Sequence, residues 1–526
     1  MVLIRRIAVA STESVSKESV AYRRRWWTLG VLSTSLLIIG LDNTILNVAI
    51  PTLQREFGAS ATSLQWMVDA YILVFAGLLL TMGSLGDRYG RRLALQFGLV
   101  IFGLSSLFAA QAGTSGQLIT ARALMGIGGA LIMPSTLSIL TNVFPRDERG
   151  KAIGIWAGVS GLGVGLGPLA GGLLLEHFWW GSVFFINIPI VVVALVAGVL
   201  LVPESRDPHP VPLDIPGAVL SISAVTILVF SIIEAPVRGW TDGLVLAGFG
   251  VGALLVAIFV YWEIRTDHPM LNLAFFRNPR FSAGAGAISI GFFALFGMVF
   301  GMTQYLQFVQ GYTPLEAGLR MVPVALGMAA GAGLSHRLVS RLGTNKVVAP
   351  GLVVLSAVLI SITFWDPHTE YWVIGLTFFC MAFGMGNVMA PSTDAVMGAV
   401  PEANAGVASA MNDVTRQVAG AFGVAVIGSV MNTVYSGRME DVVTRLPDEA
   451  ATAARDSVGA ASRISSMLPG EIGTRLAETA GAAFSDALGV AVLVAAGVAL
   501  AGSVFIVRFM PPRHLPQDGG SWTDAG

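Results

Sequence analysis

The stretch Gly83-Ser84-Leu85-Gly86-Asp87-Arg88-Tyr89-Gly90-Arg91-Arg92 decides the fold class of this chain. It is a short, glycine-rich and strongly charged turn between two long apolar runs. Part of it, Arg88-Tyr89-Gly90, has a counterpart in Arg341-Leu342-Gly343, which follows the tenth apolar run. A weak repeat of this kind predicts two parallel halves, a transporter architecture that places the substrate site between the halves near the bilayer midplane.

The composition is that of an all-α polytopic membrane protein. Of the 526 residues, 54% are hydrophobic and only 12% are charged, whereas a soluble domain averages about 25% charged. Fourteen apolar runs are long enough to span a bilayer, which takes about 20 residues each. They are continuously apolar and much longer than a barrel strand of ~10 residues, so they predict helices. These runs centre on 29–50, 64–83, 93–111, 118–140, 152–174, 183–202, 215–233, 244–261, 281–302, 317–333, 347–364, 373–389, 405–431 and 487–507.

The fourteen runs divide into two six-helix bundles with two helices inserted between them. We expect an N-terminal tail at 1–28, a bundle at 29–202, a linker with two extra helices at 203–262, a bundle at 263–510 and a tail at 511–526. Within the second bundle, the polar stretch 432–485 is expected to be a long extracytoplasmic loop. It could be partly helical and cap the outer mouth, or unstructured. Sixteen Lys and Arg residues fall in the short connections on the N-terminal side, against Arg55 and Arg238 opposite, which predicts cytoplasmic termini.

Several protein classes are excluded by what the sequence lacks. The net charge of −1 gives no reason to expect nucleic acid as a partner, and a single cysteine, Cys380, excludes an intrachain disulfide or a cysteine metal cluster. The tail has no apolar core with a small-residue cleavage site, so no cleaved signal peptide is expected. Neither a phosphate-binding Gly-x-x-x-x-Gly-Lys-Ser/Thr loop nor a hydrolase motif with its partners occurs. We therefore expect neither an enzyme nor a bound cofactor, and no metal site.

The first apolar run ends in Leu41-Asp42-Asn43-Thr44-Ile45-Leu46-Asn47-Val48-Ala49-Ile50-Pro51. A charge at the centre of a membrane helix costs about 2.5–3.5 kcal/mol on insertion scales, so Asp42 predicts a functional role. Asn43, Thr44 and Asn47 are expected to support it, and Pro51 to end the helix. Arg122, in the fourth run, is equally costly and needs a partner inside the bundle, unless it reaches an interface.

The fifth run is rich in glycine on one helical face. Gly163, Gly167, Gly171 and Gly172 permit close helix packing, and Pro168 removes a backbone hydrogen bond and kinks the helix. These features predict a tightly packed, bendable helix. They do not give the direction of transport.

These motifs together carry a family resemblance. The loop from Gly83 to Arg92 is similar, at nearly every position, to the cytoplasmic signature of the major facilitator superfamily. The Asp42 stretch, Trp66-Met67-Val68-Asp69-Ala70-Tyr71 and the glycine–proline helix resemble the fourteen-helix drug:proton antiporter family 2. Within it, the chain looks like the quaternary-ammonium and multidrug exporters.

The resemblance implies roles for individual residues. It implies proton coupling at Asp42 and Arg122, and substrate binding at Asp69 with Trp66, Tyr71 and Asp413. It also implies gating at Gly83, Asp87, Arg88, Gly90 and Arg91, and an antiporter helix at Gly163, Gly167, Pro168, Gly171 and Gly172. For Asp413 a structural pair with Arg416, three residues on, is the alternative. Asp394, a fourth acid, is placed at the cytoplasmic end of the twelfth run, where it needs no special role.

The expected function is a proton-coupled antiporter that exports lipophilic, cationic drugs or dyes across the bacterial inner membrane by alternating access. Trp66 and Asp69, three residues apart on one helical face, suit such a cation. The expected partners are these substrates, protons and membrane lipid, and the chain is expected to be a monomer driven by the proton gradient. Alternatives are a dedicated exporter of one antibiotic, metabolite, lipid or siderophore, a proton-coupled nutrient symporter, and a membrane sensor that transports nothing.

Overall fold

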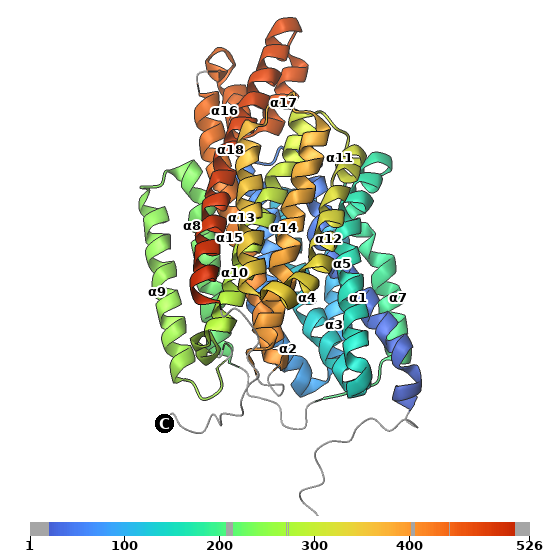
Figure 1. The fold of residues 1–526 in the computed structure, drawn as a ribbon. Coiled ribbons are helices and arrows are strands. Elements are labelled where there is room, and N and C mark those ends of the chain that lie inside the picture. The colour runs from blue at the N-terminus through green and yellow to red at the C-terminus, as the bar shows by residue number, and fades with distance from the viewer. Residues whose placement is uncertain are drawn as a thin grey trace, which may run out of the picture.

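The computed structural model describes residues 20–206, 214–269, 271, 273–400, 405–440 and 442–510. All regular secondary structure in these residues is helical, and most helices stand upright beside one another in a single bundle (Figure 1). Residues 1–19 of the predicted N-terminal tail and the whole predicted C-terminal tail lie outside the described residues.

The first half of the chain contributes seven helices. Its first helix, α1, begins before the predicted tail ends and continues through Pro51, so the expected helix end at Pro51 was wrong. A proline is tolerated inside a membrane helix where neighbouring groups satisfy the freed backbone oxygen. The sixth predicted span forms two helices, α6 and α7. The helices are α1 Val20–Phe57, α2 Ala61–Tyr89, α3 Arg91–Ala110, α4 Ser115–Val143, α5 Arg146–His177, α6 Ser182–Phe185 and α7 Asn187–Leu201.

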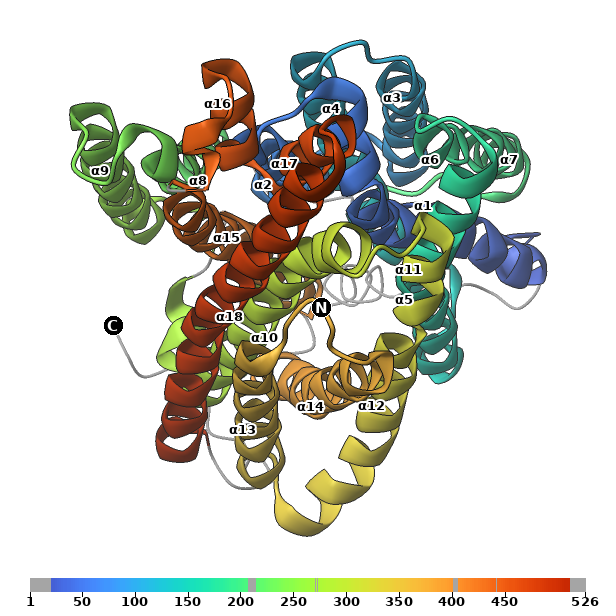
Figure 2. The same ribbon diagram turned by 90° about the horizontal axis from the view of Figure 1, so that it is seen from above.

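Two inserted helices follow, α8 (Ile215–Arg238) and α9 (Gly243–Arg265). Helix α8 packs against α2 from the first half and against α15 from the second half. Helix α9 packs against α8 and lies at the periphery of the molecule, as the view from above shows (Figure 2). The inserted pair therefore covers a junction between the two halves.

The second half repeats the bundle and adds a helical projection. The predicted loop at 432–485 contains the end of α15, the short helices α16 and α17, and the start of α18, so it is largely helical and projects at one end (Figure 1). The elements are η1 Leu273–Arg277, α10 Pro279–Gln304, η2 Tyr305–Val309, α11 Pro314–Arg320, α12 Val322–Leu342, α13 Asn345–Ser361, η3 Ile362–Phe364, α14 Tyr371–Met397, α15 Ala405–Met439, η5 Val443–Arg445, α16 Asp448–Asp456, α17 Val458–Met467 and α18 Gly470–Phe509.

The membrane spans agree with the fourteen predicted runs. In the described part of the chain, thirteen helical segments are long and apolar enough to cross a membrane. The fifth predicted run corresponds to α5, whose 32 residues are also long enough to cross. Each half has its own hydrophobic core, one built mainly from residues before Val202 and the other mainly from residues after Ala283.

The two halves are joined at the end that carries α16 and α17. There Gln65 of α2 donates to the carbonyl oxygens of Val424 and Ala425 of α15, at 3.3 and 3.1 Å. The side chain of Gln307 donates to the backbone carbonyl oxygen of Val48 at 2.9 Å. The guanidinium of Arg463 on α17 donates to the backbone carbonyl oxygen of Arg55 at 3.3 Å. These contacts close the bundle at this end.

Helix α16 also touches the first half there. The carboxylate of Asp456 accepts a hydrogen bond from the backbone N–H of Ala61, at the start of α2. Burial raises the pKa of this carboxyl, and the hydrogen bond from Ala61 offsets part of the rise. The helical projection is therefore a cap that contacts both halves.

Candidate functional site

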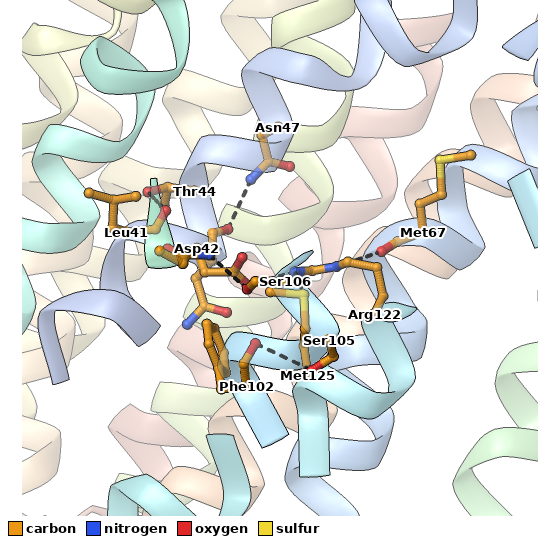
Figure 3. A network of polar contacts seen from close by, with 12 residues as sticks. Leu41, Asp42, Thr44, Asn47, Met67, Phe102, Ser105, Ser106, Arg122 and Met125 are labelled. Carbon is orange, nitrogen blue, oxygen red and sulfur yellow. Dashed lines mark hydrogen bonds and ion pairs between the residues drawn. The ribbon is translucent and has the colours of Figure 1, made fainter. Parts of the chain in front are cut away.

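An ion pair inside the first half joins Asp42 of α1 to Arg122 of α4. The distance from Asp42 Oδ2 to Arg122 Nη1 is 2.5 Å, and the two side chains are 0% and 2% exposed. Arg122 Nε also donates to the carbonyl oxygen of Met67 on α2, at 3.1 Å (Figure 3). The partner that Arg122 needs inside the bundle is thus Asp42, and the pair connects three helices.

Tyr71 of α2 lies with this ion pair. The Arg122 guanidinium carbon is 4.4 Å from the centroid of the Tyr71 ring, a cation–π distance, and the ring of Phe75 stacks on Tyr71 at 5.7 Å. The Tyr71 hydroxyl is buried and has no hydrogen-bond partner among the described residues. The sequence grouped Tyr71 with the substrate-binding residues, but the structure places it beneath Arg122.

The polar neighbours of Asp42 on α1 bond to their own helix. Asn47 Nδ2 donates to the carbonyl oxygen of Asn43 at 3.2 Å, and the Thr44 hydroxyl is 3.4 Å from those of Gly40 and Leu41 (Figure 3). Asp42 Oδ1 is buried without a hydrogen-bond partner in the part of the chain that the structure describes. The side chains of Asn47 and Thr44 thus bond to the backbone of α1, and their support of Asp42 stays a prediction.

Asp69 is a second buried carboxylate, and it lies on the other side of α2. It is 0% exposed, and neither of its carboxylate oxygens has a hydrogen-bond partner within the described ranges. Met67 and Tyr71, each two residues away, point about 160° from Asp69 because successive helical residues are turned by about 100°. Since the ring of Tyr71 contacts Arg122, Asp69 faces away from the ion pair.

The neighbours of Asp69 on α2 show what it faces. Gln65, four residues before it, bonds to α15, and Trp66, three residues before it, has its ring 6.3 Å from the ring of Phe230 on α8. Residues three and four apart lie on the same helical face. Asp69 therefore points toward the junction of α2, α8 and α15, which we call the lateral seam. Gln65 and Phe230 carry no motif and were not singled out in the sequence.

Asp413 lies on α15 in a local ion pair. Its Oδ1 is 2.6 Å from Arg416 Nη2, and the guanidinium of Arg416 is 5.2 Å from the centroid of the Phe292 ring. This is the structural pair that the sequence left open as the alternative to cation binding. Asp394 of α14 lies within electrostatic range of Arg280 on α10.

The charged turn after α2 is fixed to the chain that follows α7. Asp87 Oδ1 is 2.6 Å from Arg91 Nε, and the backbone N–H of Arg91 donates to the carbonyl oxygen of Ser205 at 2.9 Å. Gly90 has a φ of +124°, which disfavours residues with a side chain. Glu204, in the chain after α7, is partly exposed, and its Oε2 lies 3.5 Å from Arg92 Nε.

The remaining residues expected in the gate make fewer contacts. The guanidinium of Arg88 is 5.8 Å from the ring centroid of Tyr89. Gly83 lies close to α4, since a Cβ at this position would be 3.3 Å from Pro134 Cβ. Gly83 therefore serves helix packing, as the glycines of α5 do.

The glycines of α5 allow the close packing that their spacing predicts. A Cβ at Gly163 would lie 2.8 Å from the carbonyl oxygen of Leu37 on α1, and one at Gly171 would lie 2.9 Å from the side chain of Ile45. Gly167 likewise packs on Thr44. Gly172 faces the second half, where a Cβ would lie 2.6 Å from the carbonyl oxygen of Pro314. Pro168 lies inside α5, and its carbonyl group packs on Gly318 of α11.

Comparison with known proteins identifies similar chains. The family model described as Major Facilitator Superfamily matches residues 32–424. The chain is 37% identical over 428 residues to the multidrug efflux pump LfrA of Mycolicibacterium smegmatis, covering 81% of this chain and 84% of LfrA. It is 35% identical to the tetracenomycin C resistance and export protein of Streptomyces glaucescens, covering 78% and 76% of the two chains. The methyl viologen resistance protein SmvA of Salmonella typhimurium is also 35% identical, with 78% and 84% covered.

A solved structure shows the same fold. It is a bacterial homologue of the human lysosomal transporter Spinster, in an inward-facing and unoccupied conformation. The TM-score is 0.65 with 17% sequence identity, and the match covers 94% of this chain and 99% of that chain. At this identity the likeness bears on the fold alone, and it agrees with the bundle described above.

Proposed function

Because this chain belongs to the Major Facilitator Superfamily and is a drug exporter, we propose that it is a proton-coupled antiporter of lipophilic cations. It is a transporter and not an enzyme, and it is a multi-pass protein of the bacterial inner membrane. The relatives named for multidrug efflux and for methyl viologen resistance support a drug as substrate. The coupling ion, the charge of the substrate and the direction of exchange are the parts that we propose.

The buried carboxylate of Asp69, which has no hydrogen-bond partner among the described residues, is the observation that carries this proposal. A carboxylate in an apolar site binds either a proton or a cation, since either one offsets the cost of burying the charge. An indole beside it adds attraction for a lipophilic cation, and Trp66 lies on the same face of α2. Asp69 would then exchange a proton for a cationic drug each time access alternates.

The Asp42–Arg122 pair has a different part in the proposal. Protonation of Asp42 would remove one charge of the pair and release Arg122, which contacts α1 and α2 from α4. Breaking the pair would therefore loosen three helices of the first half together. We propose that this links proton binding to the movement of the halves.

Alternating access would use the contacts between the halves. Opening the end that carries α16 and α17 requires Gln65 to leave α15 and Gly172 to leave α11. Gln65 lies one turn from Asp69, so opening the bundle at this end would also open the lateral seam. We place this end outside the cell, with both termini cytoplasmic, because Lys and Arg concentrate at the opposite end.

Transport into everted membrane vesicles tests the proposal. A proton gradient formed by respiration should drive uptake of ethidium by the wild-type protein, and a protonophore should abolish it. Asp69→Asn should abolish uptake because the carboxylate is lost, and Asp42→Asn should abolish it because the pair can no longer respond to a proton. Ethidium uptake by Asp42→Asn at the wild-type rate would contradict its role in coupling.

A dedicated exporter of one antibiotic is the second candidate. It is supported by the similarity to the tetracenomycin C resistance and export protein and to the puromycin resistance protein of Streptomyces alboniger. Expression in a host that lacks its other drug pumps separates the two candidates. Resistance to several unrelated cationic dyes supports a broad exporter, whereas resistance to one antibiotic alone supports a dedicated one.

A further inference from the structure

We infer that the inserted helix α8 forms one wall of the drug site, with Phe230 as a specificity-determining residue opposite Trp66. The inference rests on the proposed role of Asp69 in binding the substrate. It extends the site beyond the two six-helix halves, to a helix whose sequence carries no motif.

Contacts on both sides fix α8 in the lateral seam. Toward α2, the Ile222 side chain packs directly on Gly77, where there is no Cβ to keep the helices apart. Toward α15, the hydroxyl of Ser429 donates to the carbonyl oxygen of Ile232 at 2.7 Å. Helix α8 therefore touches both halves where they meet.

The direction of Asp69 places its carboxylate near this wall. At about 100° per residue, Asp69 lies about 40° from Gln65 and about 60° from Trp66 around the axis of α2. Gln65 bonds to α15, and Trp66 packs on Phe230 of α8. The carboxylate thus lies between the directions of α15 and α8, on the side of α2 opposite Arg122.

Two aromatic side chains lie on the α8 side of this acid. Trp66 and Phe230 are both partly buried, and their rings are tilted by 43° with centroids 6.3 Å apart. The indole of Trp66, the ring best suited to cation–π contact, can attract the charge of any lipophilic cation, whereas the ring of Phe230 adds a ring-to-ring contact that only an aromatic cation can make. A ring of an aromatic cation can replace the contact between the two side-chain rings with its own, so the pair favours aromatic cations over alkyl cations.

The inserted helices also separate the seam from the lipid. Helix α9 lies outside α8 (Figure 2), and its apolar side chains, among them Leu246, Val251 and Leu254, are exposed. Phe230 thus lies on the inner side of the helix pair α8 and α9, and the outer side of this helix pair is suited to contact lipid. A change at Phe230 should alter substrate selectivity, whereas a change on the exposed surface of α9 should not.

The test compares transport of two probe cations by purified protein in proteoliposomes under an imposed pH gradient. The probes are tetraphenylphosphonium, which is aromatic, and dodecyltrimethylammonium, which is not. Phe230→Leu keeps an apolar side chain but removes the aromatic face, and Phe230→Trp keeps the face. Tyr261→Ala, which removes an exposed aromatic side chain from α9, is the matched control.

Phe230→Leu should raise the KM for tetraphenylphosphonium about fivefold, as expected for one lost aromatic contact. The KM for dodecyltrimethylammonium should stay within twofold, and Phe230→Trp and Tyr261→Ala should behave as wild type. Equal changes for both probes, or no change for either, would overturn the inference. Asp69→Asn separates this failure from that of the proposed function: if it transports both probes normally, the proposed function fails, whatever Phe230 does.

Discussion

Asp42 and Asp69 are both fully buried at membrane depth on neighbouring helices, yet their surroundings are opposite. Asp42 is held by Arg122 at 2.5 Å, whereas neither oxygen of Asp69 has a hydrogen-bond partner in the described residues. A carboxylate that is already paired with arginine has little affinity left for a cation, and an unpaired one has much. Burial alone therefore does not say which acid binds a ligand, but the presence of a partner does.

Arg122→Gln should have the largest effect on stability. It leaves Asp42 buried without its cation, and removing one partner of a buried pair costs about 3–5 kcal/mol. We expect a strongly reduced thermal unfolding temperature in detergent and no ethidium transport. Arg122→Lys, which keeps the positive charge, should lose less stability than Arg122→Gln. An Arg122→Gln protein as stable as wild type would mean that the pair does not hold α1 and α4 together.

Substituting Asp42 and Asp69 in turn should have clearly different effects on stability. Asp42→Asn leaves Arg122 buried without its anion but keeps an oxygen that can accept its hydrogen bond, so it should cost about 3 kcal/mol, the lower end of the range for a broken buried pair. Asp69→Asn replaces a buried carboxyl, which makes no hydrogen bond to the described residues, with a neutral amide of the same shape, so it should leave stability unchanged or increase it. Unfolding temperatures of the two variants, measured in one detergent, check this. A loss of stability in Asp69→Asn equal to that in Asp42→Asn would show that Asp69 has a partner.

Asp413→Asn should impair transport less than substitution of either Asp42 or Asp69. The Asp413–Arg416 pair is local and partly exposed, and such pairs contribute less than about 1 kcal/mol. Export of ethidium should continue, because the pair serves α15 and not the lateral seam. Minimum inhibitory concentrations of cells that express the variant provide the measurement. Full sensitivity to dyes despite normal protein levels would indicate that Asp413 takes part in substrate binding.

Tyr71→Phe should have almost no effect. The hydroxyl has no partner in the part of the chain described, so its removal leaves no polar group unpaired, and phenylalanine keeps the face that Arg122 contacts. Tyr71→Leu, which loses that face, should cost about 0.5–2 kcal/mol. Transport and unfolding temperature of both variants test the placement of Tyr71 with the ion pair. A transport defect in Tyr71→Phe with unchanged stability would favour a role in substrate binding.

The fold could be predicted almost completely from the sequence. Continuous apolar runs at membrane length are the strongest pattern that a chain can carry, and the turn from Gly83 to Arg92 added the family. The exceptions are the end of one helix and the structure of one polar stretch between apolar runs. Pro51 did not end α1. For the polar stretch 432–485 the helical alternative was confirmed, but the sequence could not choose it over a loop, because the cap depends on tertiary contacts such as that between Asp456 and Ala61.

The candidate site could be predicted only in part. The need of Arg122 for a buried partner followed from its cost in the membrane, and Trp66 and Asp69 were correctly placed on one helical face. Tyr71 was grouped with them by its position in a motif, although two residues turn a helix by about 200° and already indicate the opposite side. Phe230 could not be predicted, since no local pattern tells where an inserted helix docks.

Proton release on drug binding tests the central claim most directly. Purified protein in weakly buffered detergent, at a pH where wild type binds a proton, is mixed with a saturating amount of ethidium while a pH indicator is followed. We predict proton release by the wild type and by Asp42→Asn, and none by Asp69→Asn. Release by Asp69→Asn at the wild-type level, together with its loss in Asp42→Asn, would contradict the account and assign the exchange to Asp42.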